Sequence, residues 1–149
     1  MSLRGFERVV TADFPNAVIP RRKTRHSAGY DISAAVTVEI APKAVALVPT
    51  GIKAYMQSDE YLGLHIRSGL AVKQSLMLVN GQGIVDCDYY NNSDNEGHIM
   101  IAVVNMGAKP AVINAGDRIA QGIFYKYLLA DDDQVDVERT GGFGSTGHQ

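Results

Sequence analysis

Hydrophobic and polar residues alternate with a period of two along most of this chain, which is the pattern of half-buried β-strands. Turn-forming residues such as Pro42, Gly51 and Gly81 separate the alternating segments. Many short strands at this spacing predict an all-β fold: an antiparallel sandwich, jelly roll or barrel. The strands are expected at 36–40, 45–48, 52–55, 62–66, 76–79, 99–104, 111–113 and 123–125.

One short helix is expected at 69–75, between two of these strands, and the length of 149 residues suits a single core. Residues 1–130 are expected to form that core, followed in the same domain by residues 131–149. This last segment has an acidic connector and then a glycine-rich stretch with one large apolar side chain, so it is not expected to order itself. Two interpretations stay open: a frayed terminus, or a flexible arm that orders on a ligand.

Composition narrows the function classes. The net charge is −2, whereas a protein that binds duplex nucleic acid usually carries a basic excess, so no nucleic-acid partner is expected. The cluster formed by Arg21, Arg22, Lys23 and Arg25 is interpreted as a solvated loop. No apolar run approaches the roughly 20 residues that cross a bilayer, so no membrane partner is expected either. The N-terminus shows no apolar signal region, and Cys87 alone excludes an intrachain disulfide, which fits a reducing cytoplasm.

Residues 142–147 match the glycine pattern of dinucleotide-binding loops, G-x-G-x-x-G. That pattern needs a following helix, and only two residues remain, so a dinucleotide-binding fold is not expected. Backbone N–H groups, the hydroxyls of Ser145 and Thr146, and the upstream Arg139 nevertheless suit a phosphate group. Phe143 is suited to stacking on a base.

Two carboxylates stand at positions i and i+2, Asp86 and Asp88, and would share one face of a regular strand. Such a pair can share a metal or divide into a base and a partner, and the alternative is that both are turn or edge acids. The preceding stretch 80–83 predicts a tight hairpin whose backbone can approach a ligand. Cys87, between the two acids, is not favoured as a nucleophile without a base partner.

Residues 67–69 stand where a strand ends and the short helix begins. An arginine and a serine at a helix N-terminus suit an anion, and the alternative is that Ser68 caps the helix. The four histidines do not form an H-E-x-x-H pattern, so a zinc hydrolase is not expected.

Five segments of the chain, in this order, resemble the five motifs of the trimeric dUTPases. A single motif would be weak, but five in order form a specific signal that extends from residue 28 to residue 147. The segments are 28–34, 67–71, 80–89, 116–121 and 139–147.

The resemblance implies a jelly-roll-like β fold (the β-clip), a homotrimer with active sites shared between subunits, and a C-terminal arm that acts as a lid. It implies hydrolysis of dUTP to dUMP and pyrophosphate with Mg²⁺ as cofactor, which limits uracil in DNA and supplies dUMP for dTMP synthesis. It also implies a cytoplasmic enzyme.

The resemblance further implies roles for individual residues. Asp86 is the general base for the water that attacks the α-phosphate, and Asp31 contacts Mg²⁺ only through water. Tyr89 lies under the deoxyribose, although in a flat strand it would point away from Asp86, so the chain must curl there. The other implied substrate contacts are Arg67, Ser68, Gly69 and Gln121 for the phosphates, Asn80, Gly83, Ile84 and Val85 in the third motif, Met100, and Arg139, Phe143, Gly144, Ser145 and Thr146 in the arm.

The chain departs from the commonest dUTPase pattern at two places. Residues 90–97 are longer than the usual link and are expected to form a surface loop, and Arg139 stands one residue nearer Phe143 than in many members. Two rivals remain: a dCTP deaminase, which shares the fold but lacks such a tail, and a regulatory protein that binds a nucleotide without turnover. Asp86 and the complete tail favour the dUTPase.

Overall fold

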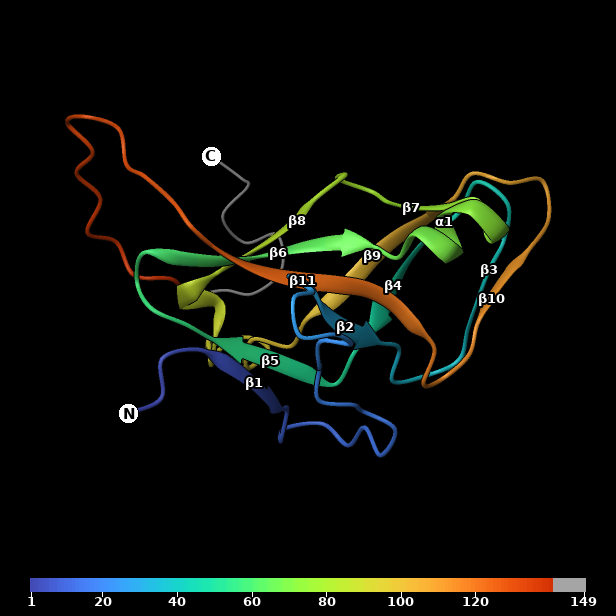
Figure 1. Cartoon of the computed structure of the whole chain (residues 1–149), viewed down its shortest axis with the longest axis horizontal. Helices are drawn as coiled ribbons and strands as arrows, with labels where there is room; N and C mark the ends of the chain where they lie inside the picture. The colour runs from blue at the N-terminus through green and yellow to red at the C-terminus, as the bar shows by residue number, and fades with distance from the viewer. Residues whose placement is uncertain (141–149) are drawn as a thin grey trace.

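The computed structural model describes residues 1–140 and consists mainly of short β-strands (Figure 1). The elements are β1 (Gly5–Arg8), β2 (Tyr30–Ser33), β3 (Val38–Ile40), β4 (Val45–Pro49), β5 (Ile52–Tyr55), β6 (Glu60–Ile66), α1 (Ser68–Gln74), β7 (Leu76–Leu78), β8 (Gly83–Asp86), the 3₁₀ turn η1 (Cys87–Tyr89), β9 (Met100–Asn105), β10 (Ala111–Ile113) and β11 (Arg118–Lys126).

The strands form antiparallel sheets whose apolar faces enclose one core. The larger sheets have the orders β2-β11-β6-β8 and β4-β9-β7, and the pairs β1-β5 and β10-β3 complete the structure. Alternation produces the inward face directly, because on β9 the residues Ile101, Val103 and Asn105 are buried while their neighbours are partly exposed. The largest buried apolar side chains are Ile32, Ile40, Val48, Ile52, Leu62, Leu76, Ile99, Ile101, Val103, Ile113 and Ile119.

The all-β prediction is confirmed, and each expected strand is present with bounds shifted by a few residues at most, except that β11 begins five residues earlier than expected. Ala120 and Gly122 obscured its start, because these small residues interrupt the alternation. They are small because β11 lies between β2 and β6, where a Cβ at Gly122 would meet Leu62 at 3.0 Å. The strands β1, β2 and β8 were not among the expected strands.

Two local predictions were wrong. The turn at 80–83 does not close a hairpin, because β7 pairs with β9 whereas β8 pairs with β6, so this turn carries the chain between two sheets. Gly81 supplies the positive φ of 74° that the turn requires. Ser68 does not cap the helix: Arg67 occupies the N-cap position without a side-chain capping bond, and Ser68 is the first helical residue.

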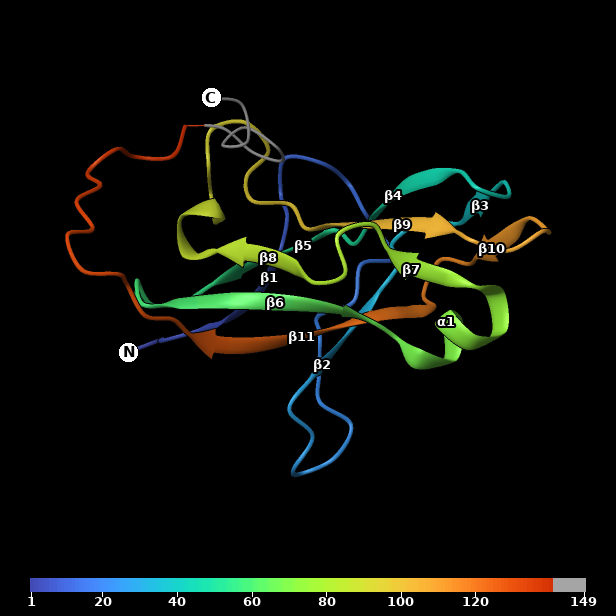
Figure 2. The ribbon, with the colours of Figure 1, turned by 90° about the horizontal axis from the view of Figure 1, so that it is seen from above.

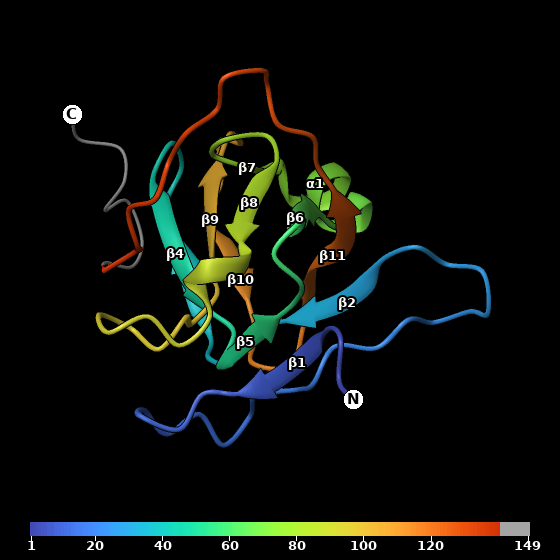
Figure 3. The ribbon, with the colours of Figure 1, turned by 90° about the vertical axis from the view of Figure 1, so that its left-hand side faces the viewer.

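Two segments leave the body of the fold. The basic segment before β2 projects outward, with Arg21, Arg22, Lys23 and Arg25 all exposed, which agrees with a solvated loop (Figure 2). After β11 the chain makes a wide excursion and returns beside η1 (Figures 1 and 3). Within residues 1–140, the single α-helix is far shorter than a membrane-crossing helix would need to be.

Candidate active site

A cavity of about 180 Å³ lies where β8 and η1 face the start of β9. Eight of the residues expected to bind or convert the nucleotide line it together. They are Asn80, Gly83, Ile84, Val85, Asp86, Tyr89, Met100 and Arg139. Met100, an expected substrate contact, lines the same cavity as the third-motif residues, despite the long loop between them.

The chain curls at the mouth of this pocket. Strand β8 ends at Asp86, and Cys87–Tyr89 turn as a 3₁₀ segment, so Asp86 and Tyr89 both line the cavity. A flat strand would point the two side chains to opposite faces, but the turn at η1 removes this separation. Asp88 belongs to η1 and not to the strand. Its carboxylate nevertheless lies near that of Asp86, since both accept hydrogen bonds from one guanidinium.

That guanidinium belongs to Arg139. Its Nη2 donates to Asp86 at 2.6 Å and its Nε donates to Asp88 at 2.7 Å. The arginine side chain is only 10% exposed, whereas each carboxylate is 55% exposed. Its Cζ lies 5.9 Å from the centroid of the Tyr89 ring. Arg139 therefore bridges Asp86 and Asp88, and its expected contact with the substrate stays a prediction.

Tyr89 forms a buried wall of the pocket. Its hydroxyl donates to the carbonyl of His98 at 2.6 Å. Burial raises the pKa of Tyr89, so the phenol stays protonated and keeps this donor at neutral pH. Burial, together with the carboxylates of Asp88 and Asp86, likewise raises the pKa of Cys87. A protonated thiol is a poor nucleophile, which agrees with the interpretation that Cys87 is not a catalytic nucleophile.

The residues expected at the phosphates gather at a different place. Gln121 on β11 lies opposite Asp31 on β2 and His65 on β6, and the backbone N–H of Arg67 donates to Ile119. The Gln121 side chain fills the space beside Gly29, where a Cβ would collide with its amide. Asp31 accepts a 3.3 Å hydrogen bond from Arg118. These residues, with Ser68 and Gly69, are the expected phosphate-binding residues.

The structure does not bring the expected phosphate-binding residues and Asp86 together within one chain. Asp86 lies opposite Tyr61 near the start of β6, and Arg67 follows the end of that strand. Six residues of extended chain therefore separate the two positions by roughly 20 Å. The four remaining predicted contacts, Phe143, Gly144, Ser145 and Thr146, lie outside the described residues.

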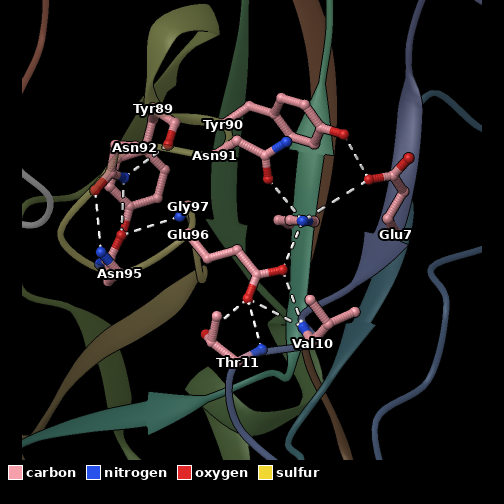
Figure 4. Close-up of polar contacts among 11 residues, drawn as sticks. Glu7, Val10, Thr11, Tyr89, Tyr90, Asn91, Asn92, Asn95, Glu96 and Gly97 are labelled. Atoms are coloured by element: carbon pink, nitrogen blue, oxygen red, sulfur yellow. Dashed lines mark hydrogen bonds and ion pairs between the residues drawn. The ribbon is translucent and has the colours of Figure 1, made fainter.

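The residues that hold Tyr89 in place through hydrogen bonds were not predicted from the sequence. They lie in loop 90–97 and on β5, and Figure 4 shows that they form one polar network. Asn92 is only 8% exposed although it stands in a run that reads as solvated loop. The available signal was the density of asparagines, since their side chains bond to nearby backbone groups and shape turns.

Glu96 anchors this loop to the N-terminal segment and to β5 (Figure 4). Its carboxylate accepts hydrogen bonds from the backbone N–H groups of Val10 and Thr11 and from the Thr11 hydroxyl. It also pairs with the buried ammonium of Lys53 at 2.6 Å, and Lys53 donates to Asn91 at 2.6 Å. Burial alone would raise the pKa of Glu96, but these donors outweigh it and lower the pKa to about 2.

Replacing Glu96 by glutamine is expected to lower the free energy of unfolding by about 3 kcal/mol near neutral pH, because the Lys53 ammonium stays buried without its counter-charge. The folded-state pKa is depressed, so the stabilisation is complete above the ordinary value of 4.5 and is lost as the pH falls toward 2. Urea unfolding across this range should show that the difference in unfolding free energy between wild type and variant shrinks as the pH falls. The exposed Glu39, changed to glutamine, is the control, and a pH-independent gap would contradict the assignment.

The donor chemistry fits a magnesium ion that is held largely by water and substrate. Within residues 1–140, no three histidine, cysteine or acidic side chains converge to build a protein cage. Mg²⁺ commonly keeps several waters and uses one or two carboxylates together with substrate phosphates. Asp31, partly exposed beside Gln121 and Arg118, is suited to contact such a water shell.

Comparison with known proteins relates the chain to one family. A family model described as dUTPase matches residues 15–147. A deoxyuridine 5'-triphosphate nucleotidohydrolase of Lactococcus lactis is 50% identical over 149 residues, which cover 99% of each chain. The crystal structure of dUTPase from Streptococcus mutans matches with a TM-score of 0.80 and 46% identity, covering 85% of this chain and 98% of that one.

A more distant structure, a mutant dUTPase from phage phi11 of S. aureus, matches with a TM-score of 0.74 at 21% identity. It covers 91% of this chain and 98% of that one, and it describes the coordination of a structural Mg(II) ion. At this identity the likeness concerns the fold alone, and it agrees with the jelly-roll-like architecture that the sequence predicts. The family model and the relative that matches over the full length together show that the chain belongs to the dUTPase family of deoxyuridine 5'-triphosphate nucleotidohydrolases.

Proposed function

We propose that this chain hydrolyses dUTP to dUMP and pyrophosphate by attack of water on the α-phosphate, with Asp86 as general base. The observation that carries the proposal is the pocket in which Asp86, Tyr89 and Asn80 meet. A carboxylate, an aromatic wall and an amide in one cavity are what a reaction on a nucleotide requires. In the cell this reaction would limit the incorporation of uracil into DNA and supply dUMP for dTMP synthesis.

The position of β8 supports recognition of uracil by backbone groups. β8 is an edge strand, so its N–H and C=O groups that point away from β6 have no strand partner within residues 1–140. Ile84 and Val85 lie on this strand and line the pocket. A base whose edge complements these groups binds well, whereas cytosine would leave buried polar groups unpaired, which is costly. Asn80 adds an amide to the lining of the same pocket.

Asp86 is suited to activate water because its carboxylate lies at the mouth of the pocket and is half exposed. In the proposed step it takes a proton from water as the oxygen bonds to the α-phosphorus. The bond from that phosphorus to the bridging oxygen breaks, and its electron pair leaves with pyrophosphate. Arg139 donates to Oδ2 of Asp86, which leaves Oδ1 of the carboxylate to accept the proton of the attacking water.

Mg²⁺ is the proposed cofactor, with Asp31 contacting its water shell rather than the ion. When bound, the ion neutralises charge on the phosphate oxygens. Arg67, Ser68, Gly69 and Gln121 are proposed to hold the same oxygens, since guanidinium, hydroxyl and backbone N–H groups all donate to phosphate.

The separation of roughly 20 Å between Asp86 and Arg67 supports a shared site in a homotrimer. An arginine side chain reaches about 7 Å, so Arg67 and Asp86 of one chain cannot meet at one α-phosphate. A second copy of the chain, supplying its own Arg67, resolves the difficulty. The proposed site therefore requires an oligomer, and three-fold symmetry provides three equivalent sites.

An exposed apolar face supports the same assembly. Val45 and Leu47 on β4 and Met77 on β7 are between 45% and 60% exposed, and Val45 and Met77 flank Val104 on the outer face of the three-stranded sheet. A contiguous apolar surface on a folded chain usually marks a protein interface.

The proposed activity is tested by pyrophosphate release from dUTP, compared with dCTP, dTTP and UTP, with and without Mg²⁺. The proposal predicts turnover of dUTP that depends on Mg²⁺ and greatly exceeds that of the other three nucleotides. Ammonia release from dCTP would instead identify a deaminase. Tight binding of dUTP without pyrophosphate release would identify a regulatory protein.

A further inference from the structure

The ring of Tyr89 is held at its far end by a residue outside the third motif. Besides donating to His98, the Tyr89 hydroxyl accepts a hydrogen bond from Nδ2 of Asn95 at 2.9 Å (Figure 4). A phenol with its donor and one acceptor site both engaged cannot swing without breaking a buried hydrogen bond. The position of the ring in the pocket therefore depends on Asn95.

Asn95 is itself fixed by the loop that contains it. Its Oδ1 accepts from Nδ2 of Asn92 at 2.8 Å and from the backbone N–H of Gly97 at 3.0 Å. Asn92 also donates to the carbonyl of Tyr89 at 2.7 Å, and its Oδ1 accepts from the backbone N–H groups of Asp94 and Asn95. The loop thus closes on Tyr89 from both the hydroxyl and the backbone.

Close packing reinforces these bonds. Gly97 has a φ of 89°, and a Cβ there would meet the Tyr89 carbonyl oxygen at 2.7 Å. The neighbouring Glu96 is clamped by Lys53 and by the N-terminal segment. Loop 90–97 is therefore attached to β5 at one side and to Tyr89 at the other.

A wall can exclude a small group only if it does not yield. The difference between dUTP and UTP is one 2′-hydroxyl, and insertion of an extra atom is costly where the surroundings cannot shift. A tyrosine ring free to move by about 1 Å would admit the ribose. Rigid support of Tyr89 is thus a condition for sugar selection.

We propose that Asn95 is a positioning residue that holds the Tyr89 ring and thereby sets the preference for deoxyribose over ribose. This inference rests on the proposed function, in which Tyr89 lies under the sugar. It gives the long loop 90–97 a role in substrate selection, where the sequence alone suggested a surface loop.

The test compares kcat/KM for dUTP and for UTP in the wild type and in Asn95→Ala. The dUTP-over-UTP ratio is expected to fall about fivefold, the size of one lost hydrogen bond, mainly through better use of UTP. The kcat for dUTP should change less than twofold, because Asn95 does not contact the phosphates. Ser93→Ala is the matched control, since Ser93 donates to the backbone of Thr140 and not to Tyr89.

A double-mutant cycle with Tyr89→Phe separates positioning from general stability. Tyr89→Phe should lower the ratio by a similar factor, and adding Asn95→Ala should lower it no further. The ratio of the dissociation constants for dUMP and UMP gives a second readout that needs no turnover. An Asn95→Ala protein with a lower Tm but an unchanged ratio, or additive effects in the cycle, would overturn the inference. Wild-type protein inert toward dUTP would instead refute the proposed function.

Discussion

Replacing Asp86 by asparagine is expected to lower kcat for dUTP by roughly 100- to 10,000-fold, the usual contribution of a general base. Asparagine has nearly the same shape but cannot accept the proton of the attacking water. The side chain lies at the end of β8 with half of its surface exposed, so the change should leave the fold intact. The dissociation constant for a non-hydrolysable dUTP analogue should therefore change little.

Asp88→Asn is the matched control for this variant. Asp88 carries the same charge, has the same exposure and contacts the same arginine at 2.7 Å, but it is not the assigned base. Its kcat is expected to stay within about tenfold of wild type, since it loses only a contact with Arg139. If Asp86→Asn retained near-normal kcat, or if Asp88→Asn were the inactive variant, the assignment of the base would be wrong.

The second large effect is expected from Arg67→Ala, which should lower kcat/KM for dUTP by about 100-fold because a charge-assisted contact with phosphate is lost. Arg67 follows β6, far from the pocket lined by Asn80 and Asp86, so the two parts of the substrate should respond separately. Binding of deoxyuridine, which has no phosphate, should be unchanged when measured by calorimetry.

Lys73→Ala controls for loss of positive charge near the same helix. Lys73 is exposed in the last turn of α1 and is not an assigned substrate contact, so kcat/KM of Lys73→Ala should match that of wild type. An Arg67→Ala protein that loses deoxyuridine binding as strongly as dUTP turnover would place Arg67 in structural support of the pocket.

Local pattern predicted most of the fold because the strands are defined by alternation. On β9 the apolar residues Ile101 and Val103 repeat every second position, and the buried face follows from them. The strand β8 was missed because Gly83–Asp86 directly follows a glycine-rich turn, which hides where the strand begins. The hairpin expected at 80–83 failed because pairing partners are chosen by the whole core, not by the turn.

The network behind Tyr89 could not be predicted from sequence for a similar reason. Glu96 pairs with Lys53 and with Thr11, which are 43 and 85 residues away along the chain. The polar residues 90–97 carry no local pattern that predicts partners so far away in the chain. The third-motif residues, in contrast, are close in sequence, so Asn80, Asp86 and Tyr89 were predicted together and do line one cavity.

The central claim is that each active site takes Asp86 from one chain and Arg67 from another, and mixing the two inactive variants tests it most directly. Co-expressed Asp86→Asn and Arg67→Ala chains, purified as mixed trimers, are predicted to recover about one third of wild-type dUTP turnover, because one of the three sites in every mixed trimer receives both intact residues. Turnover no higher than that of the separate variants would contradict the shared site.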